Sequence, residues 1–141
     1  MVALKARFTG MTDLFSAPIH VRSARPQDAQ AIAAMSRAAL LEQHLLPPGE
    51  DDPSLAELAA RTADELEGGT VLYLLATRLE VPVAFLRCRC GERMWLLDQV
   101  YVAPPHRGDG VTALLLEELD RRAYRRGLDS TSVAISLEAA C

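Results

Sequence analysis

Hydrophobic and polar positions at the start of the chain predict one strand followed by two helices. Residues 19–24 alternate between apolar and polar side chains, which is typical of a short strand. Apolar side chains then recur every three or four positions, which predicts a helix over 26–43 and a second helix beyond a proline-rich loop. We expect Asp52 to cap the second helix, Pro53 to take its first position and the glycine pair 68–69 to end it.

From residue 70 the apolar pattern changes to a period of two. Three successive β-like runs with short polar breaks predict an antiparallel meander. They occupy residues 70–77, 82–90 and 94–102. A leucine-rich helix over 110–126 and a last strand over 130–137 follow. Because a crossover helix joins the last two strands, these should lie parallel. The predicted fold class is α/β with a mixed sheet, in the order β-α-α-β-β-β-α-β.

Length and charge set limits on this picture. The chain has 141 residues and a formal net charge of -4. Residues 1–18 show no clear period and are expected to form a flexible leader, so a single domain should cover 19–141. The charge provides no field that would hold a polyanion, which argues against a nucleic-acid partner. No apolar run approaches the roughly 18 residues that cross a membrane, and no secretory core is present, so we expect a cytoplasmic protein.

The cysteines predict neither a disulfide framework nor a metal site. Their number, three, is odd, and Cys88 and Cys90 are separated by only one residue while Cys141 is terminal. A zinc site usually needs a second pair and a longer spacing within each pair. We therefore expect reduced thiols and no metal.

The stretch VYVAPPHRGDGVTALLLEEL, residues 100–119, places a Gly-x-Gly between a predicted strand and a predicted helix, directly after Arg107. The first amides of a helix have no intrahelical partner, and glycines let the backbone approach a ligand closely, so this junction favours an anion. A phosphate-bearing cofactor is therefore expected. A dinucleotide motif would follow the first strand of a parallel unit, and a nucleotide hydrolase loop would end in Gly-Lys-Ser/Thr, so neither class fits.

The element order and the segment DQVYVAPPHRGDGVTALLLEELDRRAYRRG resemble the GCN5-related N-acetyltransferase (GNAT) superfamily. Its pattern Arg/Gln-x-x-Gly-x-Gly/Ala matches at Arg107 and Gly110, whereas Thr112 stands where the family prefers glycine or alanine. The opening IHVRSARPQDAQAIAAM is also similar to the family's usual IRxAxxxDxxxI. The resemblance covers residues 19–137. It implies acetyl-coenzyme A (acetyl-CoA) as the cosubstrate, with its pyrophosphate on the glycine loop and its pantetheine arm along the preceding strand.

The resemblance carries over to particular residues. The cofactor-binding residues that it implies are Val100, Tyr101, Val102, Arg107, Gly108, Asp109, Gly110, Val111 and Thr112. Asp109 puts a carboxylate beside the intended anion. It either lies in the first turn of the helix and faces solvent, or it competes for the same amides and weakens cofactor binding.

Catalytic and acceptor-binding roles each have two interpretations. Asp98 stands where several family members have a glutamate base, but it could equally be a strand-end carboxylate bonded to an arginine. Trp95 and Tyr101 are an even number of positions apart and an odd number from Asp98, which predicts core residues on the face opposite Asp98. His44 either borders the acceptor pocket, as the resemblance implies for this loop, or is a solvated helix-end histidine.

The implied function is direct transfer of an acetyl group from acetyl-CoA to a small amine or a peptide amine. The alternative is a shortened, non-catalytic module that binds CoA or a protein partner. Family members continue past the fifth strand with a helix and two strands, and this helix often carries a tyrosine that protonates the leaving thiolate, whereas this sequence ends at Cys141. The apolar edge at 132–137 also suggests a homodimer that pairs through the terminal strand.

Overall fold

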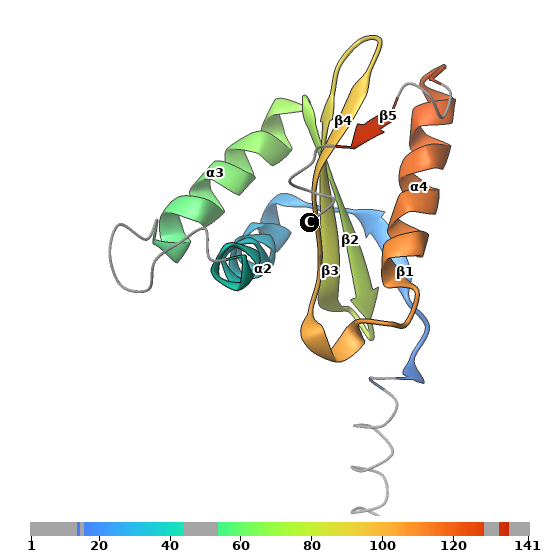
Figure 1. Ribbon diagram of the computed structural model, residues 1–141. Helices are drawn as coiled ribbons and strands as arrows, with labels where there is room; N and C mark the ends of the chain where they lie inside the picture. The colour runs from blue at the N-terminus through green and yellow to red at the C-terminus, as the bar shows by residue number, and fades with distance from the viewer. Residues whose placement is uncertain (1–13, 15, 44–53, 129–132, 136–141) are drawn as a thin grey trace, which may run out of the picture.

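The computed structural model describes residues 14, 16–43, 54–128 and 133–135, and only the backbone in the last of these segments. Figure 1 shows a twisted sheet with helices on both of its faces. The strands are β1 (His20–Ser23), β2 (Val71–Arg78), β3 (Val81–Cys90), β4 (Trp95–Val102) and β5 (Val133–Ile135). They lie in sequence order, with every neighbouring pair antiparallel except the parallel pair β4 and β5. The predicted meander and parallel pair are confirmed.

In the part of the chain that the structure describes, three helices cover this sheet. They are α2 (Ala29–Glu42), α3 (Leu55–Gly68) and α4 (Val111–Arg125). In Figure 1, α2 and α3 lie on one face of the sheet and α4 on the other. The helix predicted to start at residue 26 begins with a 3-10 turn, Pro26–Asp28, before α2 follows. None of the described helices is long and apolar enough to cross a membrane.

The start of α3 differs from the prediction. Asp52 and Pro53 lie outside the described residues, and the cap is Ser54, two positions after the expected one. The Ser54 hydroxyl accepts the amide hydrogen of Glu57 at 3.1 Å, and the Glu57 carboxylate accepts the Ser54 amide hydrogen at 3.2 Å. This reciprocal capping box satisfies two donors at once, which fixes the helix start at Leu55. Gly69, with φ +76°, ends the helix as predicted.

The sheet separates two hydrophobic clusters. One cluster lies between the sheet and α4, and its buried leucines include Leu74, Leu86, Leu97, Leu115 and Leu119. The other lies between the sheet and α2, where Phe85 packs between Tyr73 and Tyr101 with ring centroids 6.2 Å and 6.5 Å apart. Such tilted aromatic pairs add packing energy beyond their buried area. The two clusters fix the sheet between its helix layers.

A β-bulge at Asp98 interrupts the alternation of β4. Arg87 of β3 is opposite Gln99, and the next residue, Cys88, is opposite Leu97, so Asp98 is an extra residue without a partner in this register. The bulge corrects one prediction: Trp95 packs on the α4 face and Tyr101 on the α2 face, although an even spacing places them together in a regular strand. Both residues are buried in the core, as expected.

Both ends of the chain carry expectations that fall mainly outside the described residues. The predicted leader, 1–18, lies largely there, as does most of the last predicted strand except β5. In the described part of the chain, β5 pairs with β4 at Trp95, Leu96 and Leu97 and forms one edge of the sheet. The homodimer through residues 132–137 stays a prediction.

Candidate active site

The glycine loop between β4 and α4 forms a cradle. Gly108 and Gly110 have φ values of +87° and +78°, which residues with a side chain rarely adopt. Gly110 is the N-cap of α4 and offers no side chain to its first amides. A cavity of about 300 Å³ lies at this helix start, lined by Val102, His106, Arg107, Gly108, Gly110, Val111 and Thr112. The predicted cofactor loop therefore surrounds an open space into which an anion would bring its charge close to the helix N-terminus.

Asp109 does not line this cavity. It precedes the helix instead of lying in its first turn, and its carboxylate is 3.2 Å from Nη2 of Arg78, a side chain only 6% exposed. Asp109 itself remains 43% exposed. The expectation that Asp109 lies in the first turn of the helix is therefore wrong, whereas its expected exposure to solvent agrees with the structure. The buried Arg78 of β2 holds its carboxylate. The competing-anion interpretation also finds no support in this geometry.

Arg78 also fixes His106, which the sequence analysis did not single out as a site residue. Nη1 of Arg78 is 3.1 Å from Nδ1 of His106, and because arginine can only donate, Nδ1 accepts and carries no proton. Burial and the positive charge of Arg78 lower the pKa of His106. His106 therefore forms a neutral wall of the cradle. No local sequence motif marks Arg78 or His106 as a site residue, because the two residues that make this contact are 28 positions apart.

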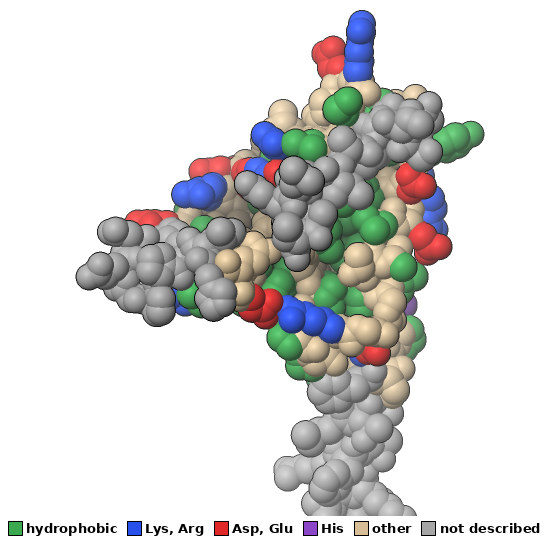
Figure 2. All heavy atoms as spheres, in the orientation of Figure 1, with side chains coloured by type: hydrophobic (Ala, Val, Ile, Leu, Met, Phe, Trp, Pro, Cys, Tyr) green, Lys and Arg blue, Asp and Glu red, His purple; other side chains and the backbone are tan. Residues whose placement is uncertain are grey.

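Arg107 spans from the cradle to α2. Its Nε donates to the Val102 carbonyl oxygen at 2.8 Å, and its Nη2 lies 3.0 Å and 2.7 Å from the two carboxylate oxygens of Glu42. Its guanidinium carbon also lies 5.5 Å from the centroid of the Tyr101 ring. Figure 2 shows acidic and basic side chains side by side on this side of the molecule. Glu42 raises the pKa of Arg107 and is a competitor for any anion that Arg107 binds.

Two peptide groups of β4 face away from β3. The Ala103 amide donates to the Val83 carbonyl oxygen at 2.8 Å, while Val102 and Val100 lie opposite Ala84 and Leu86. Since hydrogen-bonding directions alternate along a strand, the N–H and C=O groups of Val100 and Val102 point toward the β5 side. Among the described residues, the pairing of β5 with β4 stops at Leu97. These peptide groups are placed to bind an extended ligand.

A second cavity, of about 290 Å³, lies where α2 and α3 meet the sheet. Residues Asp98, Gln99 and Val100 of β4 line it. The other polar side chains in its wall are Ser36, Gln43, Arg61, Thr62, Glu65, Tyr73 and Arg87. Gln99 is positioned by Ser36 of α2, whose hydroxyl accepts its amide hydrogen at 3.2 Å. β4 thus connects the two cavities, with Val100 at one and Val102 at the other.

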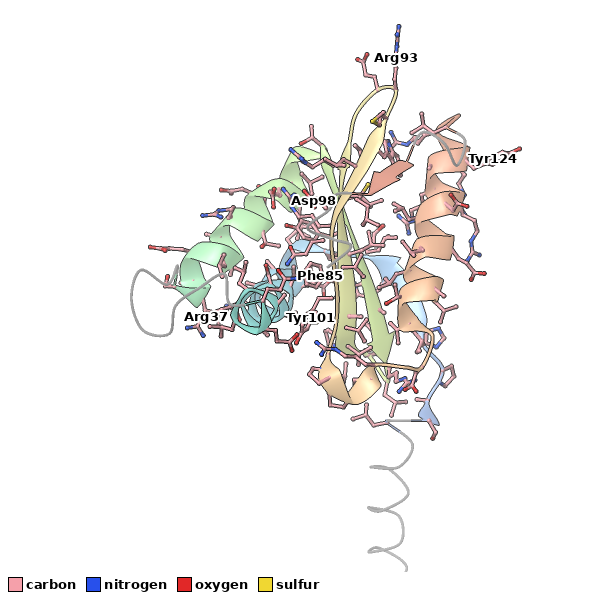
Figure 3. The ribbon with its side chains drawn as sticks, in the orientation of Figure 1. Arg37, Phe85, Arg93, Asp98, Tyr101 and Tyr124 are labelled. Atoms are coloured by element: carbon pink, nitrogen blue, oxygen red, sulfur yellow. The ribbon has the colours of Figure 1, made fainter. Side chains whose placement is uncertain are left out.

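Asp98 is a buried, paired carboxylate in this second cavity, with a side chain 15% exposed. Figure 3 shows it on the side of the sheet that faces α3. Its Oδ2 pairs with Arg87 and lies 3.3 Å from Nε of Arg89, while Oδ1 is buried without a hydrogen-bond partner among the described residues. Burial raises the pKa of Asp98 against the opposing effect of the two arginines. The predicted arginine pairing is confirmed, and the role of Asp98 as a base stays a prediction.

Comparison with known proteins identifies the family. Residues 37–140 match the family described as Acetyltransferase (GNAT) family. The chain belongs to the GNAT acetyltransferase family. A structure from Arthrobacter sp. FB24, assigned as an acetyltransferase, is 28% identical and has a TM-score of 0.66, over 84% of this chain and 74% of that one. The resemblance on which the sequence analysis relied is thereby confirmed.

Two further structures share the GNAT fold with this protein. One, from Clostridium acetobutylicum, is assigned as an acetyltransferase and contains acetyl-CoA; it is 16% identical, with a TM-score of 0.68 over 84% of this chain and 80% of that one. The other is PaiA N-acetyltransferase from Thermoplasma acidophilum with coenzyme A, 15% identical, with a TM-score of 0.63 over 78% and 74% of the two chains. The curated protein sequences give no match.

One predicted site residue of this GNAT protein cannot be placed. His44 lies outside the described residues, so its two interpretations stay open. Its neighbour Gln43 lines the second cavity. Glu65, Arg87 and Arg61, which the sequence analysis did not single out, also line that cavity. They come from α3 and β3, and no motif marks them in the sequence.

Proposed function

We propose that this GNAT protein transfers the acetyl group of acetyl-CoA to the amine of a small molecule or a peptide. The observation that carries the proposal is the open cradle at the start of α4. Its two positive-φ glycines have no side chains that could cover the first amides of the helix, and Asp109 pairs with Arg78 and does not line the cavity. The solved neighbours that contain acetyl-CoA or coenzyme A support this choice of cosubstrate.

The residues of the cradle have separate parts in binding. The first amides of α4, at Val111 and Thr112, would donate to the pyrophosphate of acetyl-CoA. The helix dipole adds only about 0.3 to 1 kcal/mol per exposed charge, so directed hydrogen bonds supply most of the affinity. The outward peptide groups of Val100 and Val102 would pair with the pantetheine arm, and Val102 shares its carbonyl oxygen with Arg107.

The second cavity would hold the acceptor. Acetyl-CoA supplies a thioester carbonyl carbon; the amine nitrogen forms a C–N bond to it, and the C–S bond breaks with its electron pair going to sulfur. The amine must lose a proton, and of the two carboxylates that line this cavity among the described residues, Asp98 and Glu65, Asp98 is the proposed acceptor because it lies on β4, beside the path proposed for the pantetheine arm. The thiolate takes a proton from water in this proposal.

The test measures thiol release from acetyl-CoA with a panel of small amines and peptides, alongside calorimetric binding of coenzyme A. Turnover that falls about 10²- to 10⁴-fold in Asp98→Asn, with unchanged coenzyme A affinity, is the expected result. Glu118→Gln is the matched control, because Glu118 also pairs with arginines at 15% exposure but lies on α4. Binding without turnover on any amine would favour the non-catalytic module instead.

A further inference from the structure

Arg87 of β3 lies between two carboxylates from different elements. It pairs on one side with Asp98 of β4 and on the other with Glu65 of α3. The Tyr73 hydroxyl of β2 donates to Oε1 of Glu65 at 2.6 Å, and Nε of Arg87 donates to the Tyr73 oxygen at 3.2 Å. All three charged side chains are mostly buried, at 15% to 22% exposure. The four groups form one network in the wall of the second cavity.

This network has one more negative charge than positive. The single guanidinium of Arg87 pairs with both carboxylates, so it stabilises the negative charge of each one less than it would stabilise one alone. Arg89 also approaches Asp98, but its side chain is 58% exposed and its effect is screened by water. The two carboxylates respond differently. Burial would raise the pKa of Glu65, but hydrogen bonds from Arg87 and Tyr73 hold it below its ordinary value, whereas the pKa of Asp98 is raised.

We propose that Glu65 is a positioning residue for acetyl transfer: by holding Arg87, it prevents Arg87 from fully stabilising the Asp98 carboxylate, and so keeps Asp98 basic enough to accept the amine proton. The inference rests on the proposed function. A base bound to an unshared arginine would be a weaker proton acceptor. The divided guanidinium orients Asp98 without removing its basicity.

Other titratable groups around Asp98 do not replace Glu65. Those that act on its charge or share its cavity are Arg87 and Arg89 from β3, Tyr73 from β2, and Arg61 with Glu65 from α3, while Cys88 of β3 packs on the α4 face. The α2 residues in the cavity wall, Ser36, Ala39, Leu40 and Gln43, are uncharged, and β5 contains no titratable residue. Among the described carboxylates around Asp98, Glu65 is therefore the one that opposes the arginines.

The experiment compares wild type, Glu65→Gln and Glu118→Gln by ¹³C NMR titration of the Asp98 carboxyl, assigned with Asp98→Asn. Glu65→Gln should lower the pKa of Asp98 by about one unit, because a nearby like charge is lost and Arg87 is released to Asp98. Glu118→Gln should leave it unchanged. In the acetyl-transfer assay, kcat of Glu65→Gln should fall about threefold, following a weaker base, with KM for acetyl-CoA unchanged.

Several outcomes overturn the inference. An Asp98 pKa that does not move in folded Glu65→Gln rejects the coupling, and a pKa that falls without any change in kcat rejects its role in transfer. If Glu65→Gln does not fold, Glu65→Asp tests the same link: the shorter side chain withdraws the carboxylate from Arg87, so the pKa of Asp98 should fall, and no change or a rise rejects the coupling. The titration needs no substrate, so a wild-type protein inactive on every amine refutes the proposed function separately.

Discussion

Two glycines at the ends of α4 provide a matched test of the cradle. Gly110 is the N-cap, with φ +78°, and Gly127 follows the helix, with φ +82°. A Cβ atom built at either position meets no atom within 4 Å, so neither alanine variant has a steric clash with the folded protein. The substitutions Gly110→Ala and Gly127→Ala therefore impose the same backbone strain at opposite ends of one helix.

The strain and the loss of binding can be separated in magnitude. An alanine in the left-handed region costs about 1 to 2 kcal/mol, which corresponds to a Tm lower by about 3 to 8 °C for a chain of this size. Gly110 additionally lines the cradle, and Gly127 does not. A methyl group at Gly110 would displace a bound phosphate from the first amides of α4. Each charge-assisted hydrogen bond lost is worth about 1.5 to 3 kcal/mol, or roughly ten- to a hundredfold in Kd.

Thermal unfolding without ligand and calorimetry with coenzyme A measure the two effects. We expect both variants to lose similar stability, while Gly110→Ala alone weakens coenzyme A binding by tenfold or more. Equal loss of affinity in both variants would mean that strain in α4, rather than space at its N-terminus, controls binding. Wild-type affinity in Gly110→Ala would mean that the phosphates bind elsewhere.

Three further predictions test the hydrophobic core and two ion pairs of the fold. Leu115→Ala should lower the free energy of unfolding by about 2 to 5 kcal/mol in urea titration, because Leu115 is fully buried against the sheet. Asp28→Asn should lower the free energy of unfolding by about 1.5 to 3 kcal/mol at pH 7, because Asp28 accepts two hydrogen bonds from Arg22. Arg22 lowers the pKa of Asp28, so the wild type loses this stabilisation as the carboxylate is protonated. In urea titrations at decreasing pH, the difference in unfolding free energy between variant and wild type should therefore shrink below about pH 4. Glu42→Gln should release Arg107 and tighten coenzyme A binding severalfold in calorimetry, most clearly at low salt.

The elements and the cradle could be read from the sequence because both depend on local pattern. The change of period near residue 70 separates helices from strands, and the spacing of Gly108 and Gly110 marks backbone that other residues rarely adopt. The start of α3 carries two conflicting local signals, because Asp52 with Pro53 predicts a cap at 52, whereas the Ser-x-x-Glu of Ser54 and Glu57 forms the observed cap.

What could not be read are the contacts between distant segments. The ion pair of Arg78 with Asp109 and that of Arg107 with Glu42 join different elements, and periodicity records only which face a residue takes. The bulge was also hidden, since one extra residue at Asp98 leaves the strand's composition unchanged. These features decide that Asp109 leaves the cradle open and that Tyr101 faces α2.

In the proposed function, the bulge at Asp98 is what would let the two cavities serve one reaction. In a regular strand Asp98 and Tyr101 would lie on opposite faces, but the extra residue directs both toward the helices α2 and α3. It also follows directly after Leu97, where β5 pairing ends among the described residues, and so precedes the peptide groups of Val100 and Val102 that face away from β3. At about 3.3 Å per residue, Asp98 and Val102 are separated by roughly 13 Å. An extended arm along β4 could therefore have its phosphates at the cradle and its reactive end beside Asp98, which a compact anion could not achieve.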